Sequence, residues 1–564
     1  MDPILLEVLR NELSSITEEM AITVHRTAKS PILRMGDFAT SLIDAKGRLV
    51  GLGAAMHLHA TMFMRVMPFI LDKYKGAGFK PGDVIICNDP YAGAAHMPDV
   101  IVVMPVFHQH QLAGFSIIYS HQPDIGGRFP GGFSSHCAES YEEGIRLSNL
   151  KLYEAGVRNE GIVDLLKANI RASDEWMGDI EAKLAGCWRG AREFEQVIEK
   201  HGIERVNACF EYLIDHAERT MRAAIAAVPV GDYSGEAMLH DDGFGTPGVQ
   251  FPIKITLRFR GDKLIVDFTG TSRQLKSALN MPYSNTLGQV FSGVHSVLCQ
   301  DGVFNSGSVK PIEFIAPSGS LVNPEFPAAV GGRAPVIFLL TDALHSAFSK
   351  VLPERIWVPP DGGDVVHISG QRADGSTYTT MDLMWGGWGG RPAMDGVDGA
   401  GRSYSTVPVE LIEREGPVVV ESFGLVADTG GPGKYRGSLS VFREYRFLRP
   451  AKIMVRTNRP FEAGAGLAGG GRGGPSVNYL TRVGREPEVL PRGTHVHLEV
   501  EPGDRLYHRV AGVAGHGPAS ERDPKLILRD IAEGKLTPNA AQEQYPVSLD
   551  PEALRLATSG KEYC

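Results

Sequence analysis

Imidazole and carboxylate side chains gather between residues 82 and 144. His121 and Asp124 stand three positions apart, a spacing at which a neutral nitrogen and a hard oxygen can converge on one divalent cation. This pair of donors suits zinc, manganese or iron. His96 and His136 are further candidate ligands from neighbouring loops. The residue types in this stretch are thus those of a divalent-metal site, with these four side chains as its candidate ligands.

Carboxylates close to the histidines are candidates for the accompanying chemistry. Asp37, Asp89 and Asp99 could add to the metal ligands, orient them or transfer protons as catalytic groups. A structural interpretation competes with this one. Asp before Pro, as at Asp89, and Asp before Ile-Gly-Gly, as at Asp124, also stabilise turns. The residue types alone leave both interpretations open.

Three apolar runs must hold these side chains in place. They cover residues 84–86, 100–107 and 113–119, and each borders a polar turn rich in glycine or proline. Short apolar runs between turn residues are typical of buried strands. The candidate side chains are therefore expected at strand ends, on loops that a sheet supports.

Several longer segments have apolar residues at three- and four-residue spacing, which predicts amphipathic helices. Asp2 and Pro3 supply an N-cap and a first helical position for the first of them. The expected helices cover residues 3–28, 57–74, 159–228 (as two or three helices) and 278–300.

Glycine is abundant, at 66 residues, and beyond residue 311 it alternates with strand patterns such as those at 404–406 and 439–447. An earlier hairpin is predicted for 253–260 and 263–268. We therefore expect an α+β fold of several layers. Residues 1–230 would form a domain with the long helices and the metal site, and residues 231–564 a glycine-rich domain that contains strands.

The composition is that of a globular protein outside the membrane. Its 564 residues exceed what one hydrophobic core usually supports, and 57 basic against 66 acidic residues give a formal net charge of -9. Neither a nucleic-acid partner nor an anionic membrane is indicated. The six cysteines include no Cys-x-x-Cys pair, and no apolar run approaches the roughly 20 residues of a membrane span. A cytoplasmic protein with reduced thiols is expected.

Nucleotide-binding motifs do not occur among the glycine runs. None has Gly-x-x-x-x-Gly-Lys-Ser/Thr, and none is a Gly-x-Gly-x-x-Gly between a strand and a helix. We therefore expect that this chain does not itself bind ATP. A Gly-x-Ser-x-Gly nucleophile elbow is missing as well.

Several longer strings, in this order along the whole chain, resemble the hydantoinase B/oxoprolinase family. They are Asp37-Phe38, Asn88-Asp89-Pro90-Tyr91, His96-x-Pro98-Asp99, His121-x-x-Asp124-Ile125-Gly126-Gly127, Asp267-Phe268-Thr269-Gly270, Asp428-Thr429-Gly430-Gly431-Pro432-Gly433-x-Tyr435-Arg436-Gly437 and Glu521-Arg522-Asp523-Pro524. The family comprises B-type chains of N-methylhydantoinases, the C-terminal half of 5-oxoprolinases, caprolactamases, and the corresponding chains of acetone and acetophenone carboxylases.

The resemblance implies a division of labour between two subunits. An A-type subunit of the actin-like kinase superfamily would bind ATP and phosphorylate the substrate oxygen of a cyclic amide or ketone. The B-type chain would then use a divalent metal to polarise a carbonyl or bicarbonate, or to lower the pKa of a water. The resemblance favours His121 and Asp124 as ligands and extends the set to His96 and His136.

Three functions remain open at this point. The first is a B-type catalytic subunit of an ATP-dependent hydrolase that opens a hydantoin, oxoproline or lactam ring. The second is a subunit of an ATP- and bicarbonate-dependent ketone carboxylase, because Pro130-Gly131-Gly132-Phe133 resembles those members and Gln122-Pro123 replaces the His-Ala expected of hydantoinases. The third is a non-catalytic scaffold for the A-type subunit.

Overall fold

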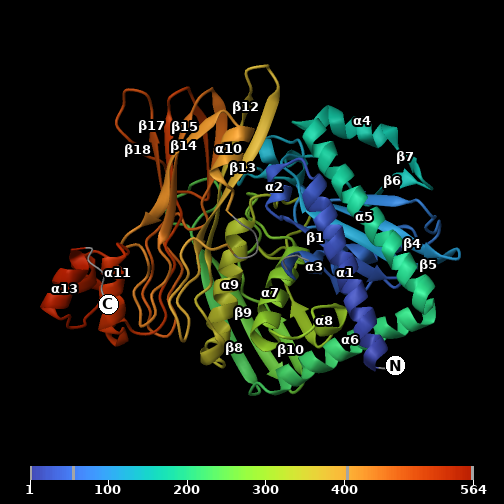
Figure 1. Ribbon diagram of the computed structural model, residues 1–564, viewed down its shortest axis with the longest axis horizontal. Helices are drawn as coiled ribbons and strands as arrows, with labels where there is room; N and C mark the ends of the chain where they lie inside the picture. Colours follow the sequence, from blue (N-terminus) through green and yellow to red (C-terminus); the bar gives the residue numbers. More distant parts are fainter. Residues whose placement is uncertain (1–2, 54–56, 402–405, 560–564) are drawn as a thin grey trace. The chain divides into compact units, whose positions relative to one another are not determined.

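The computed structural model describes residues 3–53, 57–401 and 406–559 and divides into two compact units. The first unit comprises residues 1–232 and 256–333, and the second comprises residues 233–255 and 334–564. The predicted cut at residue 230 lies beside one of these breaks. Residues 256–333, which the prediction assigned to the C-terminal domain, belong to the first unit (Figure 1).

A seven-stranded antiparallel sheet is the centre of the first unit, and it contains all three strands predicted around the candidate site. Its order is β2-β1-β5-β4-β3-β6-β7. The strands are β1 (Phe38–Asp44), β2 (Leu49–Leu52), β3 (Val84–Cys87), β4 (Asp99–His108), β5 (Gln111–His121), β6 (Leu150–Glu154) and β7 (Val157–Arg158).

The β4–β5 hairpin forms the middle of this sheet. Its two-residue turn, Gln109 and His110, has φ values of 46° and 69°, the positive values that a type I′ turn requires. One bulge interrupts the pairing next to Val106. From Ala113 to His121 every residue of β5 is buried, so both faces of the sheet are covered at this strand.

Helices cover the sheet, as the apolar spacing predicted. In Figure 1, α1 (Pro3–Thr27) and α5 (Ser173–His201) cross in front of β4 and β5, and both contact the sheet. The close approach of α5 to the sheet depends on Gly186, because a Cβ there would lie 2.6 Å from the side chain of Ile118 on β5. The other helices of this unit are α2 (Pro31–Arg34), α3 (His57–Lys73), α4 (Glu160–Asn169), α6 (Ile203–Ala226), α7 (Tyr283–Leu298) and α8 (Ser306–Val309).

A buried lysine of α5 makes stability depend on pH. Lys183 is fully buried, its Nζ donates a hydrogen bond to the Val100 carbonyl at 3.3 Å, and burial lowers its pKa to about 7. The unfolded chain therefore binds more protons than the folded one from about pH 7 up to the ordinary lysine pKa of 10.5, and stability rises with pH across that window. In urea titrations, we expect wild type to gain roughly 2–3 kcal/mol relative to Lys183→Met between pH 6 and 9. A difference that does not change with pH would contradict this prediction.

The predicted hairpin near residue 260 is confirmed. Strand β9 (Phe251–Arg260) pairs antiparallel with β10 (Lys263–Asp267), which in turn pairs parallel with β11 (Ile312–Ile315). The fourth strand of this sheet is β8 (Gly231–Leu239). The boundary between the two units falls within β8 and β9.

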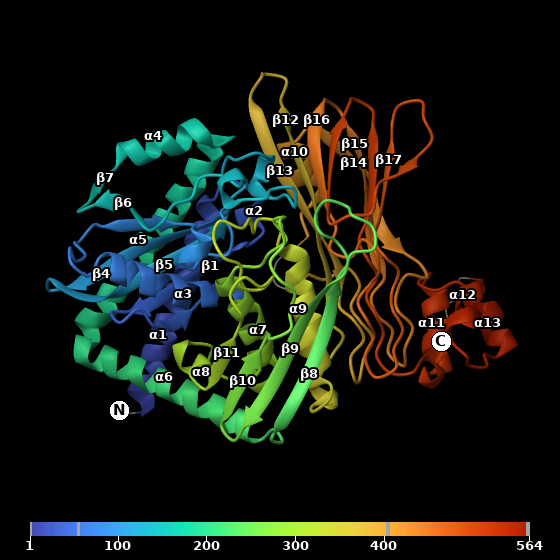
Figure 2. The same ribbon diagram turned by 180° about the vertical axis from the view of Figure 1, so that it is seen from behind.

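The second unit contains two more sheets, visible from behind in Figure 2. One has the order β13-β12-β16-β19 and the other β14-β15-β20-β17-β18. Their strands are β12 (Asp361–Gln371), β13 (Thr377–Gly387), β14 (Val418–Val426), β15 (Ser440–Phe447), β16 (Ala451–Arg456), β17 (Val477–Thr481), β18 (Glu488–Val489), β19 (His495–Val500) and β20 (Arg505–Arg509). The strand pattern predicted at 404–406 falls mostly on residues that are not described.

The longest helix of the second unit that the sequence prediction missed is α9 (Ala334–Phe348). Nearly every residue of α9 is buried, so the segment lacks the polar face on which the helical pattern depends. The short α10 (Val409–Glu415) and the C-terminal α11 (Pro524–Ala532), α12 (Pro538–Gln544) and α13 (Pro551–Thr558) complete the unit. With the strands, these helices confirm a mixed α+β fold.

Buried ion pairs cross the core of the second unit. On β15, Arg443 forms two hydrogen bonds of 2.7 and 2.6 Å with Asp382 of β13, and Tyr445 donates to the same carboxylate. Nearer the C-terminus, Arg522 binds Asp395 at 2.7 Å and Asp530 at 2.6 Å. The string Glu521-Arg522-Asp523-Pro524 therefore has a structural role in this unit.

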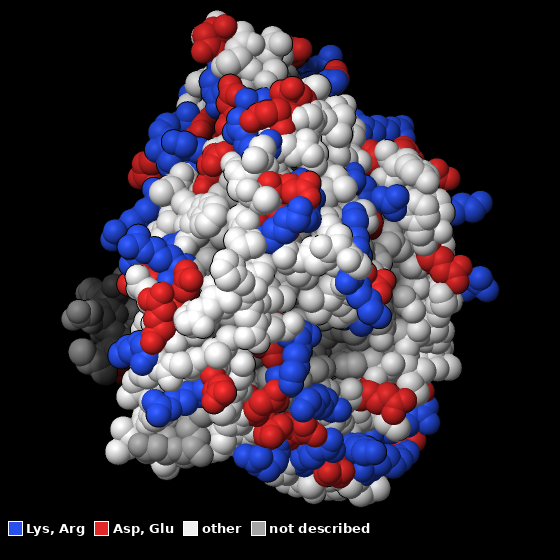
Figure 3. Space-filling view, turned by 90° about the vertical axis from the view of Figure 1, so that its right-hand side faces the viewer, with Lys and Arg blue, Asp and Glu red and all other residues white. Residues whose placement is uncertain are grey.

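The surface carries mixed charge. On the face shown in Figure 3, basic and acidic side chains are interspersed, in keeping with the balanced composition. Among the described residues, the helices are all too short or too polar to span a membrane.

Candidate metal centre

Three neighbouring strands bring Asp37, Asp99 and His121 to one end of the seven-stranded sheet. Asp99, the first residue of β4, pairs with His121, the last residue of β5. Phe38 of β1 pairs with Ser120, so Asp37 lies beside His121, whose backbone N–H donates to the Asp37 carbonyl at 3.2 Å. Directly opposed residues of antiparallel strands have side chains on the same face. The pairing alone therefore collects the three side chains.

Asp99 and the two imidazoles of His96 and His121 form a compact buried group. His96 Nε2 and His121 Nδ1 each lie 2.9 Å from Asp99 Oδ1, and the two nitrogens are 3.1 Å apart. The three residues are only 2, 1 and 3% exposed, in the order His96, Asp99, His121. His96 comes from the loop before β4, where its carbonyl accepts the Asp99 N–H at 2.9 Å.

This spacing fits a divalent cation. Adjacent ligands of an octahedral ion with bonds of about 2.1 Å lie roughly 3.0 Å apart. Two imidazoles and one carboxylate on one face also match the donor set of many iron sites, and zinc and manganese accept the same atoms. The second ring nitrogens, His96 Nδ1 and His121 Nε2, are buried and have no hydrogen-bond partner among the described residues.

The electrostatics of the group favour the protonation states in which these side chains can bind a metal. Burial, together with the charge of Arg333, lowers the pKa of His96 to about 3, so its imidazole is neutral. Burial alone would raise the pKa of Asp99, but His96, His121 and Arg333 hold that pKa well below its ordinary value. A neutral imidazole and an ionised carboxylate are the forms that bind a metal.

Three side chains that the sequence did not reveal hold Asp99 in position. Tyr119 donates its hydroxyl to Asp99 Oδ1 at 3.1 Å, and Arg333 Nη2 donates to Oδ2 at 3.1 Å. Asn285 of α7 in turn accepts from Arg333 Nε at 2.6 Å. In the sequence, Arg333 follows Gly331-Gly332 and stands directly before an apolar segment, and a cation in that position is the one available signal of its role.

Asp37 lies next to the group with properties of a proton acceptor. Burial is the main cause that raises its pKa, to about 6, and nearby Asp99 adds to the effect. The Tyr119 hydroxyl is 3.5 Å from Asp37 Oδ1, and His59 Nε2 is 3.9 Å from the same oxygen. A carboxyl with a pKa near neutrality can take up and release protons under ordinary conditions.

Asp124 is buried but lies outside this group. Its Oδ1 accepts from the backbone N–H of Gly126 at 2.8 Å and of Arg171 at 3.1 Å. Its Oδ2 accepts from the Gly131 N–H at 2.8 Å and from the Arg171 guanidinium at 3.2 Å. The turn interpretation accounts for the bond from Gly126, and the bonds from Gly131 and Arg171 tie the turn to neighbouring segments.

Asp89 and His136 also lie outside it. Asp89 caps a short 3-10 helix, Pro90–Ala92, and its Oδ1 accepts the Tyr91 N–H at 3.0 Å. His136 is half-buried, with its ring edge against Phe129 at 6.2 Å between centroids. Of the four ligands predicted from sequence, the structure brings His96 and His121 together, and Asp99 joins them in place of Asp124 and His136.

The roles of the Asp99 and Asp124 carboxylates can be distinguished by experiment. We expect Asp124→Asn to retain bound metal and to lose about 1–3 kcal/mol of stability, because an amide group would face N–H donors. Asp99→Asn should instead lose metal. Elemental analysis and urea unfolding of both variants test this. Metal loss in Asp124→Asn with unchanged stability would identify Asp124 as a ligand.

Comparison with known proteins places the chain in a family. The family model described as "Hydantoinase B/oxoprolinase" matches residues 2–519. The chain belongs to the hydantoinase B/oxoprolinase family. This finding confirms the resemblance seen in the sequence strings.

Individual relatives span nearly the whole chain. A putative D-/L-hydantoinase chain of the B type, from Pseudomonas sp. (strain NS671), is 32% identical over 97% of this chain and 95% of its own length. The crystal structure of the ATP-dependent caprolactamase from Pseudomonas jessenii matches with a TM-score of 0.91 and 26% identity, over 99% of each chain. A nucleotide-free acetone carboxylase structure matches with the same TM-score at 18% identity, over 99% of this chain and 82% of that one, and shares the fold. The family is thus one of ATP-dependent enzymes.

Proposed function

We propose that this protein is the B-type catalytic subunit of an ATP-dependent cyclic-amide hydrolase. Its substrate, a hydantoin, oxoproline or lactam, is phosphorylated by a separate A-type subunit of the actin-like kinase superfamily. The observation that carries the proposal is the buried group of His96, Asp99 and His121, in a chain similar throughout to a hydantoinase component and a caprolactamase. Relatives described as subunits support a partner chain, and such a complex is expected in the cytoplasm.

In this proposal His96, Asp99 and His121 hold a zinc, manganese or iron ion. When bound, the ion supplies a Lewis acid that polarises a carbonyl or lowers the pKa of a water. Asp37 accepts a proton beside it, since its pKa of about 6 lies close to neutrality. Arg333 and Tyr119 keep the Asp99 carboxylate ionised and oriented.

A ketone carboxylase that uses ATP and bicarbonate is the second candidate. One structural feature favours it: Phe133, from the stretch that resembles ketone carboxylases, stacks on the His121 ring at 4.9 Å between centroids. An aromatic wall there would shape the space next to the imidazole and favour a compact, apolar substrate. The shared fold with acetone carboxylase is compatible with either reaction.

The two reactions differ in their need for bicarbonate. We expect the complex with its A-type partner to hydrolyse ATP in the presence of a cyclic amide, and to release the ring-opened product without added bicarbonate. The measurement is ATP turnover with hydantoin, 5-oxoproline, caprolactam or acetone, with and without isotopically labelled bicarbonate, followed by mass spectrometry. Label in a new carboxylate would overturn the hydrolase proposal in favour of the carboxylase.

A further inference from the structure

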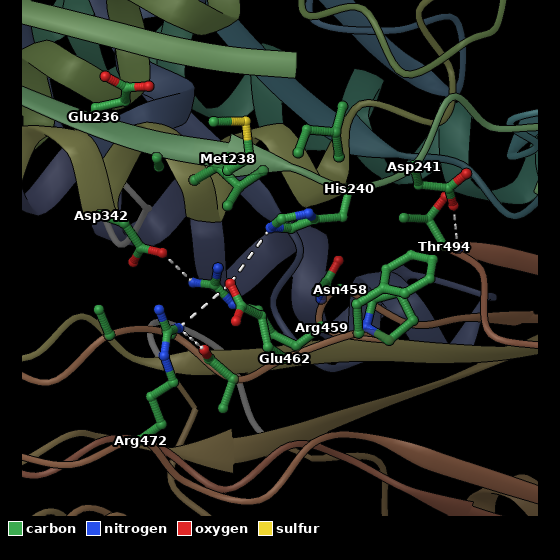
Figure 4. Close-up of a pocket in the computed structure, with 18 residues that line it drawn as sticks. Glu236, Met238, His240, Asp241, Asp342, Asn458, Arg459, Glu462, Arg472 and Thr494 are labelled. Atoms are coloured by element: carbon green, nitrogen blue, oxygen red, sulfur yellow. Dashed lines mark hydrogen bonds and ion pairs between the residues drawn. The ribbon is translucent and has the colours of Figure 1, made fainter. Parts of the chain in front are cut away.

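The second unit contains a pocket of about 240 Å³ that is separate from the candidate metal residues in sequence and in unit (Figure 4). Its walls come from the end of β8, from α9, from the loop after β16 and from the glycine-rich loop that carries Arg472. Both acidic and basic side chains line it, among them Asp342, Arg459, Glu462 and Arg472.

The inner part of the pocket holds a carboxylate and a guanidinium. Arg459 Nη2 donates to Asp342 Oδ2 at 2.6 Å, and Figure 4 shows the two groups directed toward each other. Arg459 is 7% exposed. Burial raises the pKa of Asp342 even though Arg459 acts to lower it. The Arg459 hydrogen bond engages Oδ2 of Asp342, and the Asp342 side chain is still 19% exposed, so the carboxylate can accept from a second cation in the pocket.

The outer part of the pocket has a looser arrangement of charge. The Glu462 carboxylate lies between an imidazole and a guanidinium, 3.4 Å from His240 Nε2 and 3.6 Å from Arg472 Nη1, as Figure 4 shows. Arg472 also donates to the Ala463 carbonyl at 2.6 Å. The Glu462 and Arg472 side chains are each about half exposed. Exposed pairs of this kind contribute little stability, so Arg472 can exchange its partner for a ligand carboxylate.

Glycine keeps the space beside the inner pair open. A Cβ on Gly464 would lie 3.4 Å from Arg459 Nη2 and 3.8 Å from Asp342 Oδ2, with no closer neighbour. The backbone of Gly464 is outside the left-handed region, so the conformation does not itself require glycine. A larger side chain at this position would fill the pocket next to the buried charges.

We propose that this pocket binds a small zwitterion of the amino-acid class. The ligand's ammonium group lies against Asp342, and its carboxylate binds the Arg472 guanidinium. A simple anion would place its charge among the carboxylates, and a simple cation would face the two arginines. A zwitterion matches both signs. Binding here needs neither ATP nor the metal ligands of the first unit; because a ring-opened lactam is itself such a zwitterion, variants of this pocket must separate the binding from product binding at those ligands.

Calorimetric titration of the full-length chain, without nucleotide, tests the proposal with 6-aminohexanoate as the probe. Hexanoate and hexylamine carry one charge each on the same carbon chain. We expect 6-aminohexanoate to bind at least about 10-fold more tightly than either, since each lost charge pair removes a hydrogen-bonded contact. Equal binding of hexanoate, equal binding of hexylamine, or no binding of any probe would overturn the proposal.

Two variants locate the binding in this pocket. Gly464→Leu and Arg472→Gln should each weaken 6-aminohexanoate binding about 10-fold or more, whereas Arg485→Gln, at an exposed arginine that does not line the pocket, should leave it unchanged. Arg472 is half exposed, so its variant is expected to fold normally even if Gly464→Leu does not. Unaltered binding in Arg472→Gln would overturn the assignment.

Discussion

Replacing His121 with alanine is expected to remove the bound metal and to lower amide-dependent ATP turnover by about 1,000-fold or more. His121 supplies one of only three clustered ligand atoms among the described residues, and the loss of a Lewis acid worth several kcal/mol corresponds to a factor of this size. The measurement is elemental analysis of the purified complex with its A-type partner, together with its steady-state turnover.

His108→Ala is the matched control for this change. His108 ends β4 on the same hairpin, is half-buried and lies at the opposite end of the strand from Asp99. The control should keep its metal and activity. Metal retained in His121→Ala would show that the site is misplaced. A His121→Ala complex that assembles and turns over normally would instead support the scaffold alternative.

Replacing Arg443 with methionine is expected to destabilise the protein by about 3–5 kcal/mol. The guanidinium is 1% exposed and satisfies both oxygens of the buried Asp382, as well as the Val407 carbonyl. Removing it leaves a buried carboxylate with only Tyr445 as a donor among the described residues. The measurement is the urea midpoint and slope of the unfolding transition.

Arg446→Met provides the control on the same strand. Arg446 pairs with Glu421, but both side chains are partly exposed to solvent. Exposed pairs typically contribute less than about 1 kcal/mol. If the two variants lose the same stability, the buried ion pair of Arg443 contributes no more than the exposed pair of Arg446. Restoration of stability in the double variant Arg443→Met/Asp382→Leu would show that the unpaired charge, rather than lost packing, causes the effect.

Local pattern was enough to find most of the first unit. The strands at the candidate site and the long helices follow from short apolar runs and from three- and four-residue spacing. Helix α9 was missed because a helix buried on all sides has no alternation of polar and apolar faces. Residues 256–333 belong to the first unit because they contact residues far away in the sequence, and no local pattern predicts such contacts.

The candidate site was foreseen only in part for the same reason. His96 and His121 were predicted as ligands from their residue type. Asp124 resembles a ligand in the sequence, but in the fold its carboxylate accepts backbone N–H groups and stabilises a turn. A spacing of three positions after His121 cannot distinguish these roles. Arg333 contacts Asp99 across more than two hundred positions of sequence, so its role appears only in three dimensions.

The β4–β5 turn limits which sequence changes the candidate site can accept during evolution. Nine strand residues, roughly 30 Å, separate Gln109 from the Asp99 end of the hairpin. Turn type and loop length fix the register of a hairpin, and a slip by one residue would send every side chain to the opposite face. An insertion in this surface turn, far from the candidate ligands, would therefore disrupt the group of His96, Asp99 and His121. Insertions and deletions in this turn should therefore be tolerated less well than is usual for an exposed loop.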